Sequence, residues 1–432
     1  MIPVRRHAAA ALLGLAALNA APAATASQYG CRGIEAPGFG MIEGREGAVF
    51  RIDPDLHADH WMTDGTVARI ARLADALAAG GTRLVVVPVP TKSMAMPEEL
   101  PLLAAHAGFD SAMAASLYGE NLRRLRARGV LAVDGRAAMR RLALAGTAPF
   151  PALDPRPTPE GLRALAAAVG ETLDAAGLRP DAPRRFESQA GAPHPVPSAM
   201  RARLAARCDG DLPSVKRAAW TTRVLPSFDA AAPAASVAVA ASALGGAEPF
   251  AGFVQEATGR LADAVLHVEG EDAFSAITSL LAGPALDAGR PEVLVWAFPV
   301  WADLAARGDA PWAELTAAAA ASCASPMALG ADPATGRLRA ALAAVPAGPG
   351  AVLRLETGTP GARRASFVFV AADGARRVRS VHRAADAATG GRFYVPLAGL
   401  FPGGAAGVEI ETDAGFGPRP ALSVCTLPEE RS

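Results

Sequence analysis

Residues 67–87, VARIARLADALAAGGTRLVVV, combine two patterns that together decide the fold class. Apolar residues recur at helical spacing from Val67 to Leu77, so they share one face of a helix. Gly80-Gly81 stops that helix, and the run Arg83 to Val87 has the length and β-branched composition of a buried strand. An amphipathic helix leading directly into a buried strand is the repeating unit of an α/β fold.

The same alternation extends outward over residues 40–307. A second helix is expected near residues 110–127, before the apolar run 130–133. Thr158 is expected to cap a third helix, with Pro159 in its first turn. Further strand candidates are residues 237–241, 264–267 and 293–298. We therefore predict an α/β domain built on a mainly parallel sheet, interrupted by a proline-rich excursion over residues 179–235.

Beyond residue 324 the pattern changes to short apolar runs separated by regular turn signals. This change predicts an all-β module, most simply a sandwich. The expected organisation is a signal peptide over residues 1–26, the α/β domain over 27–310 and the β-sandwich over 311–432. The expected strands of the sandwich are residues 351–356, 366–370, 376–381, 392–397, 408–411 and 422–425.

The first segment has the features of an export signal. Arg5-Arg6 precedes an apolar stretch over residues 8–18, and Ala24-Thr25-Ala26 supplies small residues for cleavage near Ala26. The apolar stretch is too short for a bilayer of about 30 Å, and no later run reaches about 20 apolar residues. We expect an exported mature chain without a membrane span; an uncleaved signal anchor is the alternative.

Overall charge argues against a nucleic-acid partner. The 42 basic and 42 acidic side chains cancel, so the chain as a whole does not attract a polyanion. A composition that is 51% hydrophobic and 19% charged also excludes a disordered chain.

Four cysteines in an exported chain predict two disulfides rather than a metal site, which would need spacing such as Cys-x-x-Cys. Three pairings are open. We favour Cys31 with Cys208 and Cys323 with Cys425, because the second pair brackets the compositionally distinct β segment. No metal and no other cofactor is expected.

Two positions carry candidate chemistry. Ser242 follows the expected strand 237–241 and precedes Gly245-Gly246, at the sheet edge where α/β folds bind ligands. Asp154 lies in the loop just ahead of the helix capped by Thr158. Structural alternatives exist for both, since serine is common after strands and aspartate is common in turns.

Several blocks, in order and spacing, resemble one known family. They are Ile42 to Arg51, Val86 to Lys92, Asp154 to Gly161, and Ala241-Ser242 with Phe250 to Phe253 downstream. Together they resemble the alginate O-acetyltransferases of the AlgX and AlgJ type. That resemblance implies an SGNH-hydrolase-like domain, a periplasmic location and acetylation of an exopolysaccharide. The AlgX branch implies a C-terminal β-sandwich carbohydrate-binding module, with disulfides arranged like those favoured above.

The resemblance also implies site roles. In this family a serine attacks an acetyl donor, and an Asp-x-His pair supplies the base and the group that orients it. Ser242 takes the nucleophile position and Asp154 the aspartate position, but Arg156 stands where the histidine is expected. Arginine stays protonated and cannot act as a general base. Pro157 and Ala297 also depart from the expected Trp and Glu.

Two histidines are candidates for a base that would replace the missing histidine. His60 lies before the first helix in a sequence that superficially resembles the missing motif, and His267 ends a candidate strand. A packed or solvated structural histidine is the simpler interpretation of each.

The β module carries seven arginines in one segment that contains only two acidic residues. Guanidinium groups pair with carboxylates in a bidentate fashion, so this surface is suited to a polyuronate. A solvated strand face is the alternative, and strand alternation leaves open which arginines share a face. The predicted polysaccharide-binding residues are Arg376, Arg377, Arg379, Arg392 and Tyr394.

These patterns lead to a predicted role in alginate-like exopolysaccharide biosynthesis. One hypothesis is acetyl transfer to the polymer through an acyl-enzyme on Ser242, in a site that is intact or catalytically degenerate. The alternative is a non-catalytic polysaccharide-binding or scaffolding subunit, and an esterase that uses water as acceptor is a third. Expected partners are an anionic polysaccharide, a membrane-bound acetyltransferase and export-complex proteins.

Overall fold

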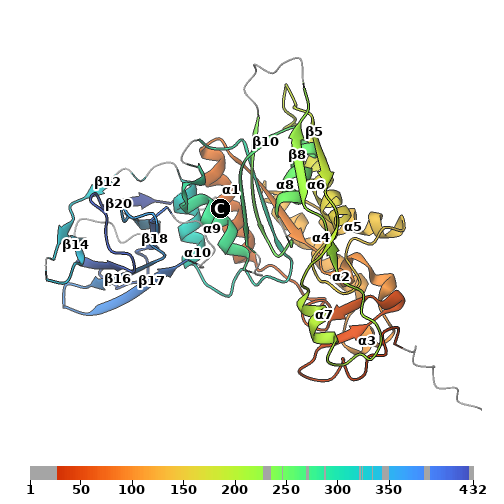
Figure 1. The fold of residues 1–432 in the computed structure, drawn as a ribbon. Coiled ribbons are helices and arrows are strands. Elements are labelled where there is room, and N and C mark those ends of the chain that lie inside the picture. Colours follow the sequence, from red (N-terminus) through yellow and green to blue (C-terminus); the bar gives the residue numbers. More distant parts are fainter. Residues whose placement is uncertain are drawn as a thin grey trace, which may run out of the picture.

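The computed structural model describes most of the chain after the expected signal peptide, which lies outside the described residues. The described residues are 27–226, 235–245, 247–268, 272–286, 289–320, 323, 325–332, 334–342, 350–383 and 390–427. Two parts follow each other along the chain (Figure 1): an α/β part, and an antiparallel β part that begins beyond helix α10. The predicted fold class is confirmed.

A five-stranded parallel sheet forms the centre of the first part. Its order is β10-β9-β11-β3-β4, so β9 and β11 lie inside the sheet. Valine, alanine and leucine dominate these strands because both faces are buried. The strands are β3 (Arg83–Val89), β4 (Leu131–Ala132), β9 (Ser236–Ser242), β10 (Leu261–Val268) and β11 (Val293–Pro299).

Helices cover both faces of this sheet, and alternate strand residues contribute to the two layers. On one face Trp296 and Phe298 pack with α1, α4, α9 and α10; on the other Val295 and Ala297 pack with α5, α6 and α8. The expected helices are confirmed, including the caps Thr63 and Thr158. The longer helices are α1 (Asp64–Ala79), α4 (Ser111–Ala127), α5 (Gly135–Leu144), α6 (Pro159–Ala175), α8 (Ala247–Thr258), α9 (Ala273–Ala282) and α10 (Ala310–Ala319).

The remaining short elements flank this layered core. The proline-rich excursion contains two antiparallel strand pairs: β5 with β8, and β6 with β7. Their bounds are β5 (Phe186–Ala190), β6 (His194–Pro195), β7 (Lys216–Arg217) and β8 (Trp220–Val224), with α7 (Ala199–Leu204) between them. Elsewhere lie β1 (Met41–Glu43), β2 (Val49–Arg51), α2 (Lys92–Ala95), α3 (Leu103–His106), and 3-10 turns at Arg45–Gly47, Pro97–Glu99 and Pro284–Leu286.

The second part is a sandwich of two antiparallel sheets, ordered β12-β20-β15-β18 and β13-β14-β19-β16-β17. Inward residues of both sheets, such as Leu353 and Phe367, share one core. The strands are β12 (Ser325–Met327), β13 (Gly330–Ala331), β14 (Leu338–Ala341), β15 (Ala351–Glu356), β16 (Arg364–Val370), β17 (Arg376–His382), β18 (Arg392–Pro396), β19 (Gly407–Thr412) and β20 (Ala421–Thr426).

Helix α10 joins the two parts. One side of it places Trp312 and Leu315 in the helical layer, and the other packs Ala313 and Ala317 against the sandwich. Glu314, on the same helix, accepts two hydrogen bonds from Arg383 at 3.1 and 2.6 Å, and both side chains are almost completely buried. Separating the sandwich from α10 would therefore expose an ion pair as well as apolar surface.

The favoured disulfide pairing is confirmed. Cys31 bonds to Cys208 and Cys323 bonds to Cys425, and no described cysteine is left free. The first bond fastens the N-terminal segment to the excursion, and the second fastens the segment after α10 to the last strand. Within the described residues, the model contains no helix that combines the length and apolar character of a bilayer span.

Replacing Cys323 and Cys425 together with serine should destabilise the sandwich selectively. The bond closes a separation of 102 residues, so its loss should lower the free energy of unfolding by about 4.7 kcal/mol in the chain-entropy model. Amide hydrogen exchange in β15 and β20 should become faster. The matched variant Cys31→Ser/Cys208→Ser should leave exchange in these strands unchanged; an equal effect of both variants would contradict this prediction.

Candidate functional site

Ser242 is the last residue of β9, at the carboxyl edge of the sheet. The chain turns sharply after it: Ala243 has φ of 57° and Gly245 has φ of 73°. A left-handed conformation at a residue with a side chain is strained and is frequent at functional turns. Ser242 is fully buried, and its Oγ has no hydrogen-bond partner among the described residues. The candidate nucleophile is thus correctly placed but neither activated nor exposed.

Asp154 lies in a tightly closed loop before α6. Thr158 closes the loop by donating its backbone N–H to the Pro149 carbonyl at 2.9 Å and its hydroxyl to Ala148 at 3.0 Å. A Cβ at Gly161 would lie 2.4 Å from the same Pro149 oxygen, so only glycine permits this approach. The loop therefore fixes Asp154, which is fully buried.

Arg156 forms an ion pair with Asp154, at the position where the family resemblance implies a histidine. Its backbone N–H and Nε donate to Asp154 Oδ1 at 2.8 and 2.9 Å, and its Nη2 donates to Oδ2 at 2.8 Å. Nη2 also donates to the Pro197 carbonyl at 3.0 Å. This bidentate pair holds a permanently charged donor where catalysis would require a proton acceptor.

Arg217 connects the Asp154 loop to the turn that follows Ser242. Its Nη2 lies 3.8 Å from Asp154 Oδ1, and its Nη1 donates to the Gly245 carbonyl at 3.3 Å. A Cβ at Gly245 would lie 2.8 Å from this guanidinium, so the glycine makes the contact possible. Sequence reasoning missed Arg217, and its position in a proline-rich excursion was the only available signal.

Lys92 stabilises the Asp154 loop through hydrogen bonds to its backbone. Its buried ammonium donates to the carbonyls of Val49 at 2.9 Å, Pro151 at 2.6 Å and Ala152 at 2.7 Å. Burial lowers the pKa of Lys92 to about 7, against the opposing effect of the carboxylates of Asp55 and Asp154. All three donors are used, so this lysine positions the loop and is not available to Ser242.

No described histidine takes over as base, because Ser242 Oγ accepts and donates no hydrogen bond in the described part of the chain. His60 is held by α4, where Asn121 Nδ2 donates to its carbonyl at 2.8 Å, and burial lowers its pKa. His267 pairs with Ala241 in the sheet, and its side chain is outside what the structure describes.

Ala297 lies on β11 between Ala241 and Val87, and it is fully buried. Its methyl group fills the position where the family resemblance implies a glutamate. No carboxylate reaches the site from this strand.

The predicted polysaccharide-binding arginines of the sandwich have different partners within the protein. Arg376 pairs with Glu409 at 2.7 Å, whereas Arg377 and Arg379, two residues apart on β17, donate to carbonyls of the 396–399 segment. Arg392 lies 3.5 Å from Glu356 and donates to Gly283. Each thus has an intramolecular partner.

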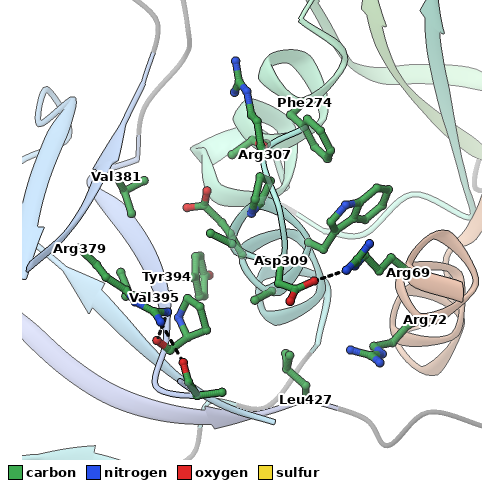
Figure 2. Close-up of a pocket in the computed structure, with 18 of the residues that line it drawn as sticks. Arg69, Arg72, Phe274, Arg307, Asp309, Arg379, Val381, Tyr394, Val395 and Leu427 are labelled. Carbon is green, nitrogen blue, oxygen red and sulfur yellow. Dashed lines mark hydrogen bonds and ion pairs between the residues drawn. The ribbon is translucent and has the colours of Figure 1, made fainter. Parts of the chain in front are cut away.

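A cleft of about 1290 Å³ lies between the helical layer and the sandwich. It brings together two predicted binding residues, Arg379 and Tyr394, with Arg69 and Arg72 of α1 (Figure 2). Tyr394 is 5% exposed, so it forms the floor of the cleft and offers little ring surface. The cleft is lined by Arg69, Arg72, Arg128, Arg307, Arg379 and Arg383, against the carboxylates Asp64, Asp272, Asp309 and Glu314.

Most of these cleft arginines already interact with the protein. Arg69 pairs with Asp309 (Figure 2), and Arg307 lies 3.2 Å from Asp272. Arg128, at the C-terminal end of α4, is exposed and has no carboxylate partner among the described residues. The cleft therefore has a small excess of positive charge, with Arg128 as a cation available to a ligand. The described residues include no cluster of three or more metal-ligating side chains.

Comparison with known proteins identifies the architecture. Residues 42–300 match the family described as SGNH hydrolase-like domain, acetyltransferase AlgX. The structure of Pseudomonas aeruginosa AlgX superposes with a TM-score of 0.72, at 20% identity, covering 90% of this chain and 94% of that one. The O-acetyltransferase domain of Pseudomonas putida AlgJ is 22% identical over 61% of this chain and 91% of its own, with a TM-score of 0.47. None of the curated proteins compared with the chain matches it.

Lys92 should make stability depend on pH in a defined window. Its pKa is about 7 in the folded chain and about 10.4 when unfolded, so between these values the unfolded state binds more protons. The free energy of unfolding of the native chain, relative to Lys92→Met, should rise from pH 7 to pH 10 with a slope approaching about 1.4 kcal/mol per pH unit. Below pH 6 the difference should be flat.

Denaturant unfolding at pH 6 and pH 9 measures this difference. Lys92→Arg is the control, because its guanidinium stays charged in both states and should show no such rise. A difference between native and Lys92→Met that is independent of pH would contradict the assignment.

Proposed function

The chain belongs to the family of SGNH hydrolase-like acetyltransferase domains of the AlgX type, and from this membership we propose that it acts in the O-acetylation of an alginate-like exopolysaccharide. The proposed location is the periplasm, after export and cleavage near Ala26, and the two disulfides are consistent with an oxidising compartment. The proposed carbohydrate-binding module is the C-terminal segment 311–432, in which the strands of the sandwich run from β12 to β20.

We further propose that the acyl-transfer site has lost its base. The supporting observation is the bidentate contact of Arg156 with Asp154, beside a serine hydroxyl without a hydrogen-bond partner among the described residues. An active site of this class would transfer the acetyl group to Ser242, release the donor's leaving group and then pass the acetyl group to a sugar hydroxyl. Both steps need a proton acceptor at the serine.

Restoring histidine tests this proposal. Arg156→His should gain acetyl release from a chromogenic acetyl ester by at least about a hundredfold, the lower limit of what general base catalysis contributes. The native protein should stay at background. Adding Ser242→Ala to Arg156→His should abolish the gain. Native activity that Ser242→Ala removes would instead establish a working serine acyltransferase or esterase without the usual base.

A second candidate function, holding the polymer without turnover, is favoured by the cleft between the helical layer and the sandwich. A groove of about 1290 Å³ with an excess of arginine is suited to an anionic chain. In this role the protein would present the polysaccharide to a membrane-bound acetyltransferase and to export-complex proteins, which are its proposed partners.

Arg128→Gln should weaken binding of a polyuronate about two- to fivefold, the effect of one exposed charge, with the larger loss at low salt. The matched control is Arg123→Gln on the same helix, because Arg123 is exposed, pairs with Glu120 and does not line the cleft. Titration calorimetry with an oligouronate measures both. Equal affinity of Arg128→Gln and native protein would show that Arg128 does not contact the polysaccharide.

A further inference from the structure

A second pocket opens directly on the loop that holds Asp154. It has a volume of about 480 Å³ and lies between residues 151–160 and the strands β7 and β8 of the excursion. It shares no lining residue with the cleft at the sandwich. Its size is within the range of small-molecule sites and is far below that of a groove for a long chain. The charged and aromatic residues that line it are Glu160, Lys216, Arg217 and Trp220.

Two charges at this pocket are left without partners by the protein. The Lys216 side chain is exposed and forms no hydrogen bond or ion pair with the described residues, and the same is true of the Glu160 side chain. Exposed ion pairs are easily formed on protein surfaces, so an ammonium and a carboxylate that line one pocket without pairing leave both groups available to a ligand. The next residue, Arg217, extends from this pocket to the Gly245 carbonyl.

Trp220 supplies the pocket with an aromatic wall. Its ring meets Phe253 edge to face at 5.0 Å, and the Arg163 guanidinium lies 5.7 Å from it. The indole N–H is buried and has no acceptor among the described residues. Because this N–H has no exposed surface, it is not offered to a ligand, and the indole contributes apolar surface to the pocket.

We propose that this pocket is a subsite for one anionic sugar unit, a hexuronate, with Lys216 binding its carboxylate. Glu160 accepts a hydrogen bond from a sugar hydroxyl, and the Trp220 ring packs against the apolar face of the sugar. The inference rests on the proposed function and adds where one unit of the polymer lies. Arg217 lines this pocket and donates to the Gly245 carbonyl, so it connects the subsite to the turn after Ser242.

The amino-acid composition makes the test selective. Lys92 and Lys216 are the only lysines in the chain, and Lys92 is fully buried. Reductive methylation of the purified mature protein with a 13C reagent therefore yields one exposed lysine signal, that of Lys216, besides the terminal amine. An oligouronate should shift this signal in a saturable way. A carboxyl-reduced oligomer of equal length and inorganic phosphate should not.

Affinity measurements on variants complete the test. Lys216→Gln should weaken oligouronate binding about fivefold and Lys216→Arg should largely restore it, whereas Arg185→Gln, an exposed charge of the same excursion, should change nothing. The proposal is overturned if the Lys216 signal does not shift when the oligouronate is added, or if phosphate shifts it equally. The ester assay on Arg156→His uses no sugar, so its result is independent of oligouronate binding. The proposal of the subsite and the proposal of the lost base can therefore be refuted separately.

Discussion

The Asp154 carboxylate is buried completely, and everything around the candidate site depends on how its charge is compensated. Arg156 provides a bidentate partner from the same loop, and Arg217 approaches from the excursion. A buried carboxylate without such partners would be strongly unfavourable. The closed loop, the excursion and the turn after Ser242 are therefore joined through one charge, and removing either arginine would disturb all three.

This arrangement explains how the family fold persists after the change at position 156. In a serine hydrolase the aspartate orients a histidine that exchanges protons with the nucleophile. Here the guanidinium satisfies the same carboxylate with two side-chain hydrogen bonds and stays charged, so the structural requirement is met by a group that does not accept a proton. Lys92 is also structural, because its three carbonyl contacts stabilise the loop and it makes no hydrogen bond with Ser242 Oγ.

The site and the sandwich are connected through the helical layer. Helix α10 packs on the sheet with one side and on the sandwich with the other, and the pair Glu314 with Arg383 is buried between them. A disulfide fixes the segment after α10 to the last strand. Because these contacts fix the sandwich beside α1 and α9, the cleft has a defined shape and is separate from the pocket at the Asp154 loop.

The sequence by itself determined the parallel sheet, the helices with their caps, the antiparallel module and the family, because these depend on local periodicity and on motifs in order. It also located Ser242 and Asp154 and the loss of histidine at position 156. Only the tertiary structure decided what the arginines do. Arg156 and Arg379 are committed to internal partners, and Arg217 joins two loops far apart in the chain. The physical reason is that the role of a charged side chain depends on the groups that surround it in the fold. Residues 154, 217 and 245 become neighbours only after the sheet and the excursion have packed.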